Sequence, residues 1–252
     1  MNILVTNDDG ILAPGIRALV EVARTIGTVI VVAPNTPQSG QGHAMTLEKP
    51  LRLHQVDVFD GIEAYECSGT PVDCVKLAKH IILKDRKVDL CLSGINHGSN
   101  AAINIIYSGT MSAAMEAALE GIHAIGFSLD DYRYEADFTA AQHYVKQIAE
   151  QVLAAGERAP KLLNVNIPAL PLAEIKGVKV CRQAEGYWRE EFISANEPRG
   201  QAYYWLTGKF TCDDTDEDAD YVALQNGYVA VVPAMHDLTD YKSISKLDFL
   251  IS

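Results

Sequence analysis

Three short stretches of this sequence place oxygen-bearing side chains beside glycine. They are residues 7–10 (NDDG), residues 38–40 (QSG) and residues 93–100 (SGINHGSN). Carboxylate, hydroxyl and amide oxygens are the ligands that Mg²⁺, Mn²⁺ and Ca²⁺ prefer in proteins. The three stretches hold no cysteine, and His97 is their one imidazole. The sequence therefore predicts a site for a hard divalent cation rather than for a structural zinc.

The first stretch carries two adjacent carboxylates, Asp8 and Asp9, at the end of an apolar run. Two carboxylates that are buried side by side repel one another, and each raises the pKa of the other. A bound divalent cation removes this problem. The alternative is that Asn7 and Asp8 form an Asx turn before a helix, as sequences rich in Asp and Gly often do. The three oxygen-rich stretches together favour the cation site.

A fourth stretch, residues 107–110 (YSGT), comes just before an expected helix. The first N–H groups of a helix, with hydroxyl groups and a glycine beside them, form a site for an anion. The alternative is that Ser108 or Thr110 only caps the helix. A cation and an anion that meet at one site indicate a metal-bound phosphate. The reaction class that follows is metal-assisted phosphoryl transfer, most simply hydrolysis.

These stretches follow apolar runs that are typical of buried parallel strands. Helical patterns alternate with the strands, which predicts right-handed βαβ units and an α/β fold with a doubly wound, mostly parallel sheet. Ligands bind beyond the carboxyl ends of the strands in such sheets, so the oxygen-rich stretches are expected to meet there. The predicted strands are residues 2–6, 28–34, 88–94, 123–129 and 162–168.

The predicted helices lie between these strands. Thr70, Pro71 and Asp73 have the spacing of an N-cap, a first-turn proline and an N3 acid, so a helix begins there. Further helices are expected near residues 16–23, 110–120 and 138–152. We expect a single domain over 1–252, with a core over about 1–168. Residues of about 170–252 form a β-rich extension used in self-association, with strands in 176–182, 201–210 and 227–234 and a terminal helix in 237–252.

Charge and composition exclude several classes of function. The 252 residues have a net charge of −12, and a pI of about 5.0 argues against a nucleic acid duplex as partner. The five cysteines are odd in number and lack a C-x-x-C motif, which favours free thiols in a reducing compartment. The chain has no signal-peptide pattern and no run of about 18 apolar residues, so we expect a cytoplasmic protein without a membrane partner.

The order of motifs resembles the SurE family of survival-protein phosphatases. The motifs are NDDGxxAPG at 7–15, SG at 39–40, SGTPxDC at 68–74, SGINxGxN at 93–100, YSGT at 107–110, NGYVxVxP at 226–233 and DLT at 237–239. The resemblance implies a Rossmann-like core and a dimer or tetramer with exchanged C-terminal elements. It also implies a 5'-nucleotidase, a phosphoric monoester hydrolase that cleaves nucleoside monophosphates, with 3'-nucleotides or polyphosphate as further substrates.

The resemblance also implies roles for individual residues. One divalent cation, Mg²⁺ or Mn²⁺, would bind to Asp8, Asp9, Ser39 and Asn96. The phosphate would lie against Asn7, Gly40, Asn96, Ser108, Gly109 and Thr110. The mechanism that we expect has no covalent intermediate: Asp8 or Asp9 orients or deprotonates the attacking water, and the hydroxyl and N–H groups neutralise charge on the phosphoryl oxygens.

Two departures from the family pattern concern acid–base helpers. Asn104 stands where relatives often carry an acid, and Met235 stands where some carry a histidine, with His236 one place later. A non-catalytic sensor that binds metal and nucleotide is therefore the alternative function. A haloacid-dehalogenase phosphatase is excluded because Asn7 occupies the position of its nucleophile, and a carboxamide cannot accept a phosphoryl group. His97 is either a contact to the leaving group or an exposed loop residue.

Overall fold

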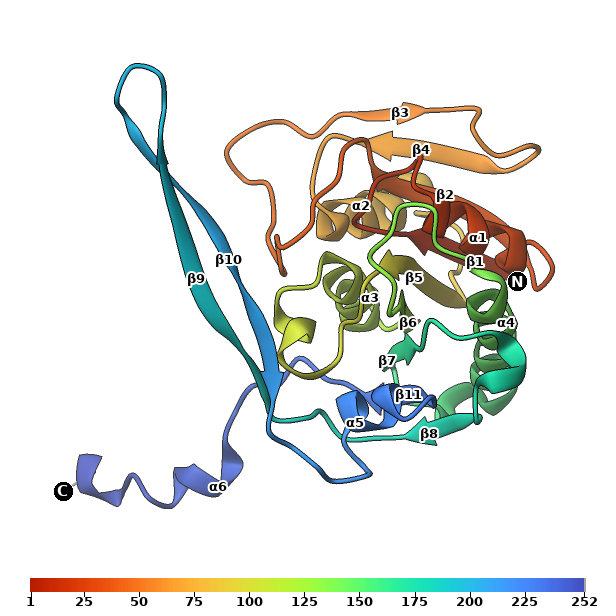
Figure 1. Cartoon of the computed structure of the whole chain (residues 1–252). Coiled ribbons are helices and arrows are strands. Elements are labelled where there is room, and N and C mark those ends of the chain that lie inside the picture. The colour runs from red at the N-terminus through yellow and green to blue at the C-terminus, as the bar shows by residue number, and fades with distance from the viewer. Residues whose placement is uncertain (252) are drawn as a thin grey trace.

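A nine-stranded mixed sheet forms the centre of the molecule in the computed structural model, which describes residues 1–251 (Figure 1). Its strand order is β3-β4-β2-β1-β5-β6-β7-β11-β8. Neighbouring strands are parallel except for the pairs β3–β4 and β7–β11. The strands are β1 (Asn2–Thr6), β2 (Thr28–Pro34), β3 (Leu53–Gln55), β4 (Glu63–Cys67), β5 (Leu90–His97), β6 (His123–Leu129), β7 (Leu162–Ile167), β8 (Val178–Val180) and β11 (Val229–Pro233).

Helices cover both faces of this sheet, which confirms the predicted doubly wound α/β class. Helices α1 (Pro14–Ala23) and α4 (Thr139–Ala155) pack together on one face over a core that includes Ile3, Val5 and Phe127. Helices α2 (Pro71–Leu77) and α3 (Gly109–Leu119) pack together over a second core on the other face. The strands between them are apolar on both sides because each face is buried.

The order in which strands are added to the sheet reverses at β1. From β1 it runs outward to β2 on one side, and β5 then pairs with the other side of β1. This is the topological switch point of the sheet, where α/β proteins bind their ligands. The turn after β1, the loop after β2 and the end of β5 are the three oxygen-rich stretches singled out in the sequence.

Two segments reach away from the sheet (Figure 1). Strands β9 (Gly186–Asn196) and β10 (Ala202–Cys212) form a long antiparallel hairpin, and the C-terminal segment carries the short helix α6 (Tyr241–Ile244). Helix α5 (Asp220–Gln225) lies between β10 and β11 and contacts the main sheet. The part of the chain after residue 168 therefore supplies two strands to the sheet as well as the projecting hairpin.

The predicted elements correspond closely to the observed ones, with three differences, the first of which is that β4 was not predicted. Thr70 caps α2 in a full capping box with Asp73, as the spacing predicted. The sequence did not reveal β9, and the terminal helix is limited to α6 and a 3₁₀ turn at Asp248–Leu250. Cys67, Cys74, Cys91, Cys181 and Cys212 are all free. Within residues 1–251, no helix combines the length and the apolar character needed to cross a membrane.

Candidate active site

The turn after β1 buries its polar side chains. Asn7 and Asp8 are almost fully buried, and Asp9 is half-buried. The Asn7 amide Nδ2 donates a hydrogen bond of 2.9 Å to the Gly10 carbonyl and so closes the turn. The Asn7 Oδ1 atom is buried and accepts no hydrogen bond from the described residues. Asn7 thus takes the turn role that the sequence allowed, and it leaves one acceptor for a ligand.

Asp8 contacts the start of α3. Its Oδ1 accepts a hydrogen bond of 2.5 Å from the hydroxyl of Thr110, which is fully buried. Gly109 lies against the same side chain, since a Cβ atom at that position would be 2.6 Å from the Asp8 Cβ. Any larger residue at 109 would displace the carboxylate. The structure therefore brings Asp8, Gly109 and Thr110 together, as predicted.

Burial sets the charge state of the two carboxylates. It raises the pKa of Asp8 to about 6, with the neighbouring Asp9 adding to the shift and the Thr110 hydroxyl opposing it. Burial also raises the pKa of Asp9, and His97 opposes that shift. Keeping both groups ionised at neutral pH therefore costs free energy. A divalent cation between them would offset this cost.

The end of β5 supplies the second side of the site. The main-chain N–H of His97 lies 3.4 Å from Asp9 Oδ2. The Asn96 amide nitrogen donates a hydrogen bond of 2.8 Å to the Gly98 carbonyl. Because its nitrogen is engaged in this way, the remaining donor atom for a cation is the Asn96 Oδ1. This orientation fits the predicted role of Asn96 as a ligand.

His97 has a positioning role within the protein. Its Nδ1–H donates to the Arg133 carbonyl at 2.8 Å, and its ring meets the edge of Phe138 at 5.2 Å. These contacts fasten the loop after β6 to the end of β5. The Nε2 atom is buried and has no hydrogen-bond partner among residues 1–251. The histidine is therefore not the freely exposed loop residue that one alternative described.

The loop after β2 lies beside the carboxylates but holds its predicted ligands outward. The Gln38 N–H donates to the Asp8 carbonyl at 2.7 Å, and the Gly42 N–H donates to the Tyr107 carbonyl at 3.2 Å. Ser39 and Gly40 between these anchors are exposed, and within the described chain neither of these two residues hydrogen-bonds to Asp8 or Asp9. Their roles as metal and phosphate contacts remain predictions.

Ser108 serves as the N-cap of α3. Its Oγ accepts from the Met111 N–H at 3.0 Å, and its carbonyl accepts from the Ser112 hydroxyl at 2.6 Å. The Thr110 hydroxyl donates to Asp8, whereas the Ser108 hydroxyl accepts from Met111 and keeps its own hydrogen free to donate to a ligand. The helix start itself, with its positive dipole end beside Asp8, remains the anion-binding feature.

An open pocket of about 420 Å³ adjoins Asp9. It lies between the turn after β1, the loop after β2 and the loop after β6. Its walls include the apolar Leu12 and aromatic and polar side chains that suit a nucleoside, namely Asn35, His97, Tyr132 and Tyr134. A ligand whose phosphate lies at the carboxylates would extend into this pocket.

Sequence reasoning missed a buried polar network behind the site. Asn166 Oδ1 accepts from the Asn100 N–H at 2.7 Å, and the Asn164 side chain donates to the Asn100 carbonyl at 2.9 Å. The Asn100 side chain donates to the Ser128 hydroxyl at 2.8 Å. The signal was present in the sequence, because Asn164 and Asn166 interrupt an otherwise apolar strand.

The side chains around Asp8 and Asp9 suit a hard cation that takes only a few of its ligands from the protein. Among residues 1–251, no group of three or more His, Cys, Asp or Glu side chains is placed to hold a metal ion. A cation at Asp8 and Asp9 would therefore complete its shell with amide, hydroxyl or water oxygens, which is ordinary for Mg²⁺. The unpaired Asn7 Oδ1 and the two destabilised carboxylates support this fit.

Comparisons with known proteins show which family this chain resembles along its length. The family model described as "Survival protein SurE" matches residues 3–190. The "5'-nucleotidase SurE" proteins of Cytophaga hutchinsonii and Flavobacterium johnsoniae are 56% and 58% identical over 246 and 247 residues, which cover 98% of this chain and 95% of each relative. The SurE protein of Aquifex aeolicus, a crystal structure, is 40% identical over the whole of both chains with a TM-score of 0.85.

Proposed function

Because the chain belongs to the SurE family, we propose that it is a 5'-nucleotidase, a phosphoric monoester hydrolase that releases phosphate from nucleoside 5'-monophosphates. The observation that carries the proposal is the pair of carboxylates, Asp8 and Asp9, buried against the start of α3. This arrangement combines a cation site with the positive end of a helix. A cation and a helix N-terminus together would neutralise the negative charge of a bound phosphate ester.

The proposed roles follow from exposure and from existing contacts. Asp8, Asp9, Asn96 and Ser39 hold one Mg²⁺ or Mn²⁺ ion. When bound, the ion supplies positive charge and lowers the pKa of a nearby water. Asp9 is the more exposed carboxylate and orients the attacking water, whereas Asp8 is fixed by Thr110.

The phosphate lies between the turn after β1, which contains Asn7, and the start of α3. The N–H groups at Gly109 and Thr110, with Gly40 and Ser108 around them, stabilise charge on the phosphoryl oxygens as it grows in the transition state. The nucleoside occupies the pocket beside Asp9. The same geometry accepts 3'-nucleotides and the end of a polyphosphate chain.

We further propose that the protein works in the cytoplasm as a dimer or tetramer. The free thiols suit a reducing compartment. The hairpin β9–β10 and the C-terminal segment carry large exposed apolar side chains, which suit contacts between copies of the chain. We expect no nucleic acid duplex as partner, because the net charge is −12. We expect no membrane partner, because the sequence has no run of about 18 apolar residues.

The first test is phosphate release from AMP, GMP and an aryl phosphate. We expect turnover with Mn²⁺ or Mg²⁺, and loss of turnover on adding EDTA. Asp9→Asn is expected to lower kcat by roughly 10²–10⁴-fold, the range typical of removing a group that positions or activates the nucleophile. Glu150→Gln is the matched control, since Glu150 is exposed on α4 away from the site.

Two outcomes would contradict the proposal in different ways. Turnover that survives both EDTA and Asp9→Asn would exclude the carboxylate site as the centre of the reaction. Metal-dependent binding of AMP without turnover, measured by calorimetry, would instead establish the sensor function.

A further inference from the structure

The segment between β5 and α3 connects two parts of the proposed site. It runs from Asn96, at the end of β5, to the phosphate turn at 108–110 and contains the 3₁₀ helix η2 (Ala102–Ile106). Ala102 begins η2 with a φ of +54°, in the left-handed region that favours glycine. An alanine adopts this conformation only when its surroundings hold it there.

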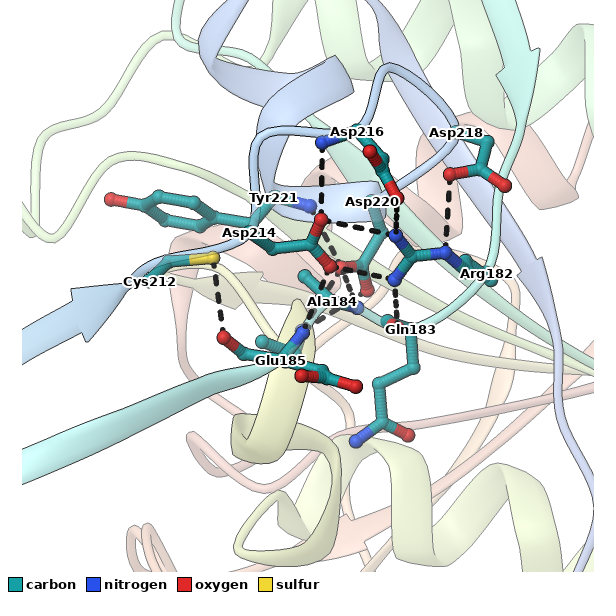
Figure 2. A network of polar contacts seen from close by, with 11 residues as sticks. Arg182, Gln183, Ala184, Glu185, Cys212, Asp214, Asp216, Asp218, Asp220 and Tyr221 are labelled. Atoms are coloured by element: carbon teal, nitrogen blue, oxygen red, sulfur yellow. Dashed lines mark hydrogen bonds and ion pairs between the residues drawn. The ribbon is translucent and has the colours of Figure 1, made fainter.

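Asp220 provides that hold from a distant part of the chain. Its side chain is almost fully buried at the start of α5. Oδ2 accepts from the Ala102 N–H at 3.0 Å, and Oδ1 lies 3.3 Å from the same nitrogen. Oδ1 also accepts from the Ala184 N–H at 2.9 Å and the Tyr221 N–H at 2.7 Å. One carboxylate thus joins the start of η2 to the base of the β9–β10 hairpin. Figure 2 shows Asp220 beside Ala184 and Tyr221.

The three neighbouring acidic residues form ion pairs with an arginine. Arg182 is paired with Asp214 at 2.6 Å, Asp216 at 2.9 Å and Asp218 at 3.1 Å, and these acids are drawn around its guanidinium in Figure 2. The three acids therefore neutralise Arg182, whereas Asp220 is bound by main-chain N–H groups. The acidic stretch 213–220 is therefore linked to the rest of the fold by ion pairs to Arg182 and by the hydrogen bonds of Asp220.

The hairpin touches η2 at a second point. The Trp188 indole Nε1–H, on β9, donates to Asn104 Oδ1 at 2.7 Å. Gly186 at the start of β9 lies so close to η2 that a Cβ atom there would be 3.1 Å from the Ala102 Cβ. The conformation of η2 is therefore set by contacts with the hairpin base as well as by its own residues.

We propose that Asp220 is a positioning residue for phosphate-ester hydrolysis: by accepting the Ala102 N–H it holds η2 in the conformation that delivers Ser108, Gly109 and Thr110 to Asp8. This inference rests on the proposed function. Asp220 touches neither substrate nor cation in this role. It acts through the backbone of the segment that enters α3, and displacements of about 1 Å at such a turn can lower turnover by about 10²-fold.

Asp220→Asn separates the two contacts of the carboxylate. The remaining carbonyl oxygen can keep the Ala184 and Tyr221 N–H groups, while the new NH₂ group faces the Ala102 N–H and cannot accept from it. Ala102 is then left with only the longer contact of 3.3 Å to Oδ1. We expect kcat for AMP to fall by roughly 10- to 100-fold, with a smaller change in KM. Asp218→Asn is the matched control, since it alters an acid of the same stretch that contacts Arg182 only, and it should keep kcat within twofold, about the size of a surface effect.

Ala102→Gly supplies a rescue that a merely structural role would not show. Glycine adopts positive φ without strain, so η2 no longer needs the Asp220 contact to hold that conformation. We expect Ala102→Gly alone to be close to wild type. In the Asp220→Asn background it should restore most of the lost kcat, although it cannot restore the missing hydrogen bond.

The two tryptophans give a readout that needs no activity. In a ¹H–¹⁵N spectrum of the full chain, the Trp188 indole resonance should shift in Asp220→Asn and return in the double variant. Trp205, which is 65% exposed on β10, is the internal reference and should not move.

The outcomes distinguish this inference from the proposed function. If the wild type hydrolyses none of the phosphate esters, the proposed function fails, and the Trp188 resonance still tests whether Asp220 positions η2. An active wild type with Asp220→Asn kcat within twofold of it and an unmoved Trp188 resonance would overturn the inference. So would a loss of kcat that Ala102→Gly does not relieve, because Asp220 would then act by another route.

Discussion

Asp8 lies in the protein at an energetic cost that its partners only partly offset. Its carboxylate is removed from water, adjoins a second carboxylate, and keeps one strong hydrogen bond, from Thr110. The two buried carboxylates therefore lower the stability of the fold, but their negative charge favours the binding of a cation. At the residue scale, the Thr110 hydroxyl is therefore the contact that decides whether Asp8 keeps its orientation.

Thr110→Val tests that contact with almost no change in shape. The variant keeps the volume of the side chain but removes the donor, so the buried Asp8 carboxylate loses a charge-assisted hydrogen bond. Such bonds are worth about 1.5–3 kcal/mol, and we expect kcat for AMP to fall by roughly 10- to 100-fold. Thr110→Ser retains the hydroxyl and should keep most of the activity. Equal activity of the valine and serine variants would show that the hydroxyl does not matter to turnover.

At the element scale, local patterns predicted most of the fold and long-range contacts explain what they missed. The strands around β1 are continuous apolar runs, and the capping box of α2 lies within four residues, so both are readable from short windows. Strand β9 is exposed along nearly its whole length and lacks an apolar alternation. The contact of Asp220 with Ala102 spans 118 positions, and no local pattern announces such a pair.

The candidate site shows the same division. The carboxylates and the β5 end were predictable because they lie at the carboxyl ends of buried strands in a parallel sheet. The α3 start was predictable from the hydroxyl residues and glycine before a helical pattern. The outward position of Ser39 was not, since it depends on how the loop after β2 is anchored. One such anchor is Glu116 on α3, whose nearly buried carboxylate pairs with Lys76 at 2.5 Å and with His43, on the loop, at 2.9 Å.

His43→Ala is expected to loosen the loop that carries Ser39 while leaving the sheet intact. With that anchor gone the loop is less ordered, so more conformational entropy is lost when Ser39 closes on the cation, and half-maximal activity should require roughly 3- to 10-fold more Mn²⁺, corresponding to about 1 kcal/mol. Lys76→Met is the control, because it breaks the other pair of Glu116 without touching the loop. An equal rise in the Mn²⁺ requirement of both variants would assign the effect to Glu116 rather than to the loop.

At the scale of the whole molecule, the β9–β10 hairpin stands away from the body that carries the site (Figure 1). Phe192 pairs with Leu206 across the two strands, and the next pair, Ile193 with Trp205, points to the opposite face. All four side chains are more than half exposed. A two-stranded ribbon with large apolar side chains on both faces is not stable alone in water, so we expect a second copy of the chain to cover it.

The combined substitution Phe192→Ser and Trp205→Ser tests this expectation, because it removes one large apolar side chain from each face of the ribbon. Light scattering after size exclusion should show the wild type as a dimer or tetramer and the variant as a smaller species at the same concentration. Leu47→Ser is the control, since Leu47 is 83% exposed on the main body and should not change the mass. A wild type that elutes as a monomer would contradict the assembly. If the variant is both smaller and lower in kcat, activity depends on assembly. The hairpin base, which contacts η2 through Trp188, would then be the connection between the subunit interface and the active site.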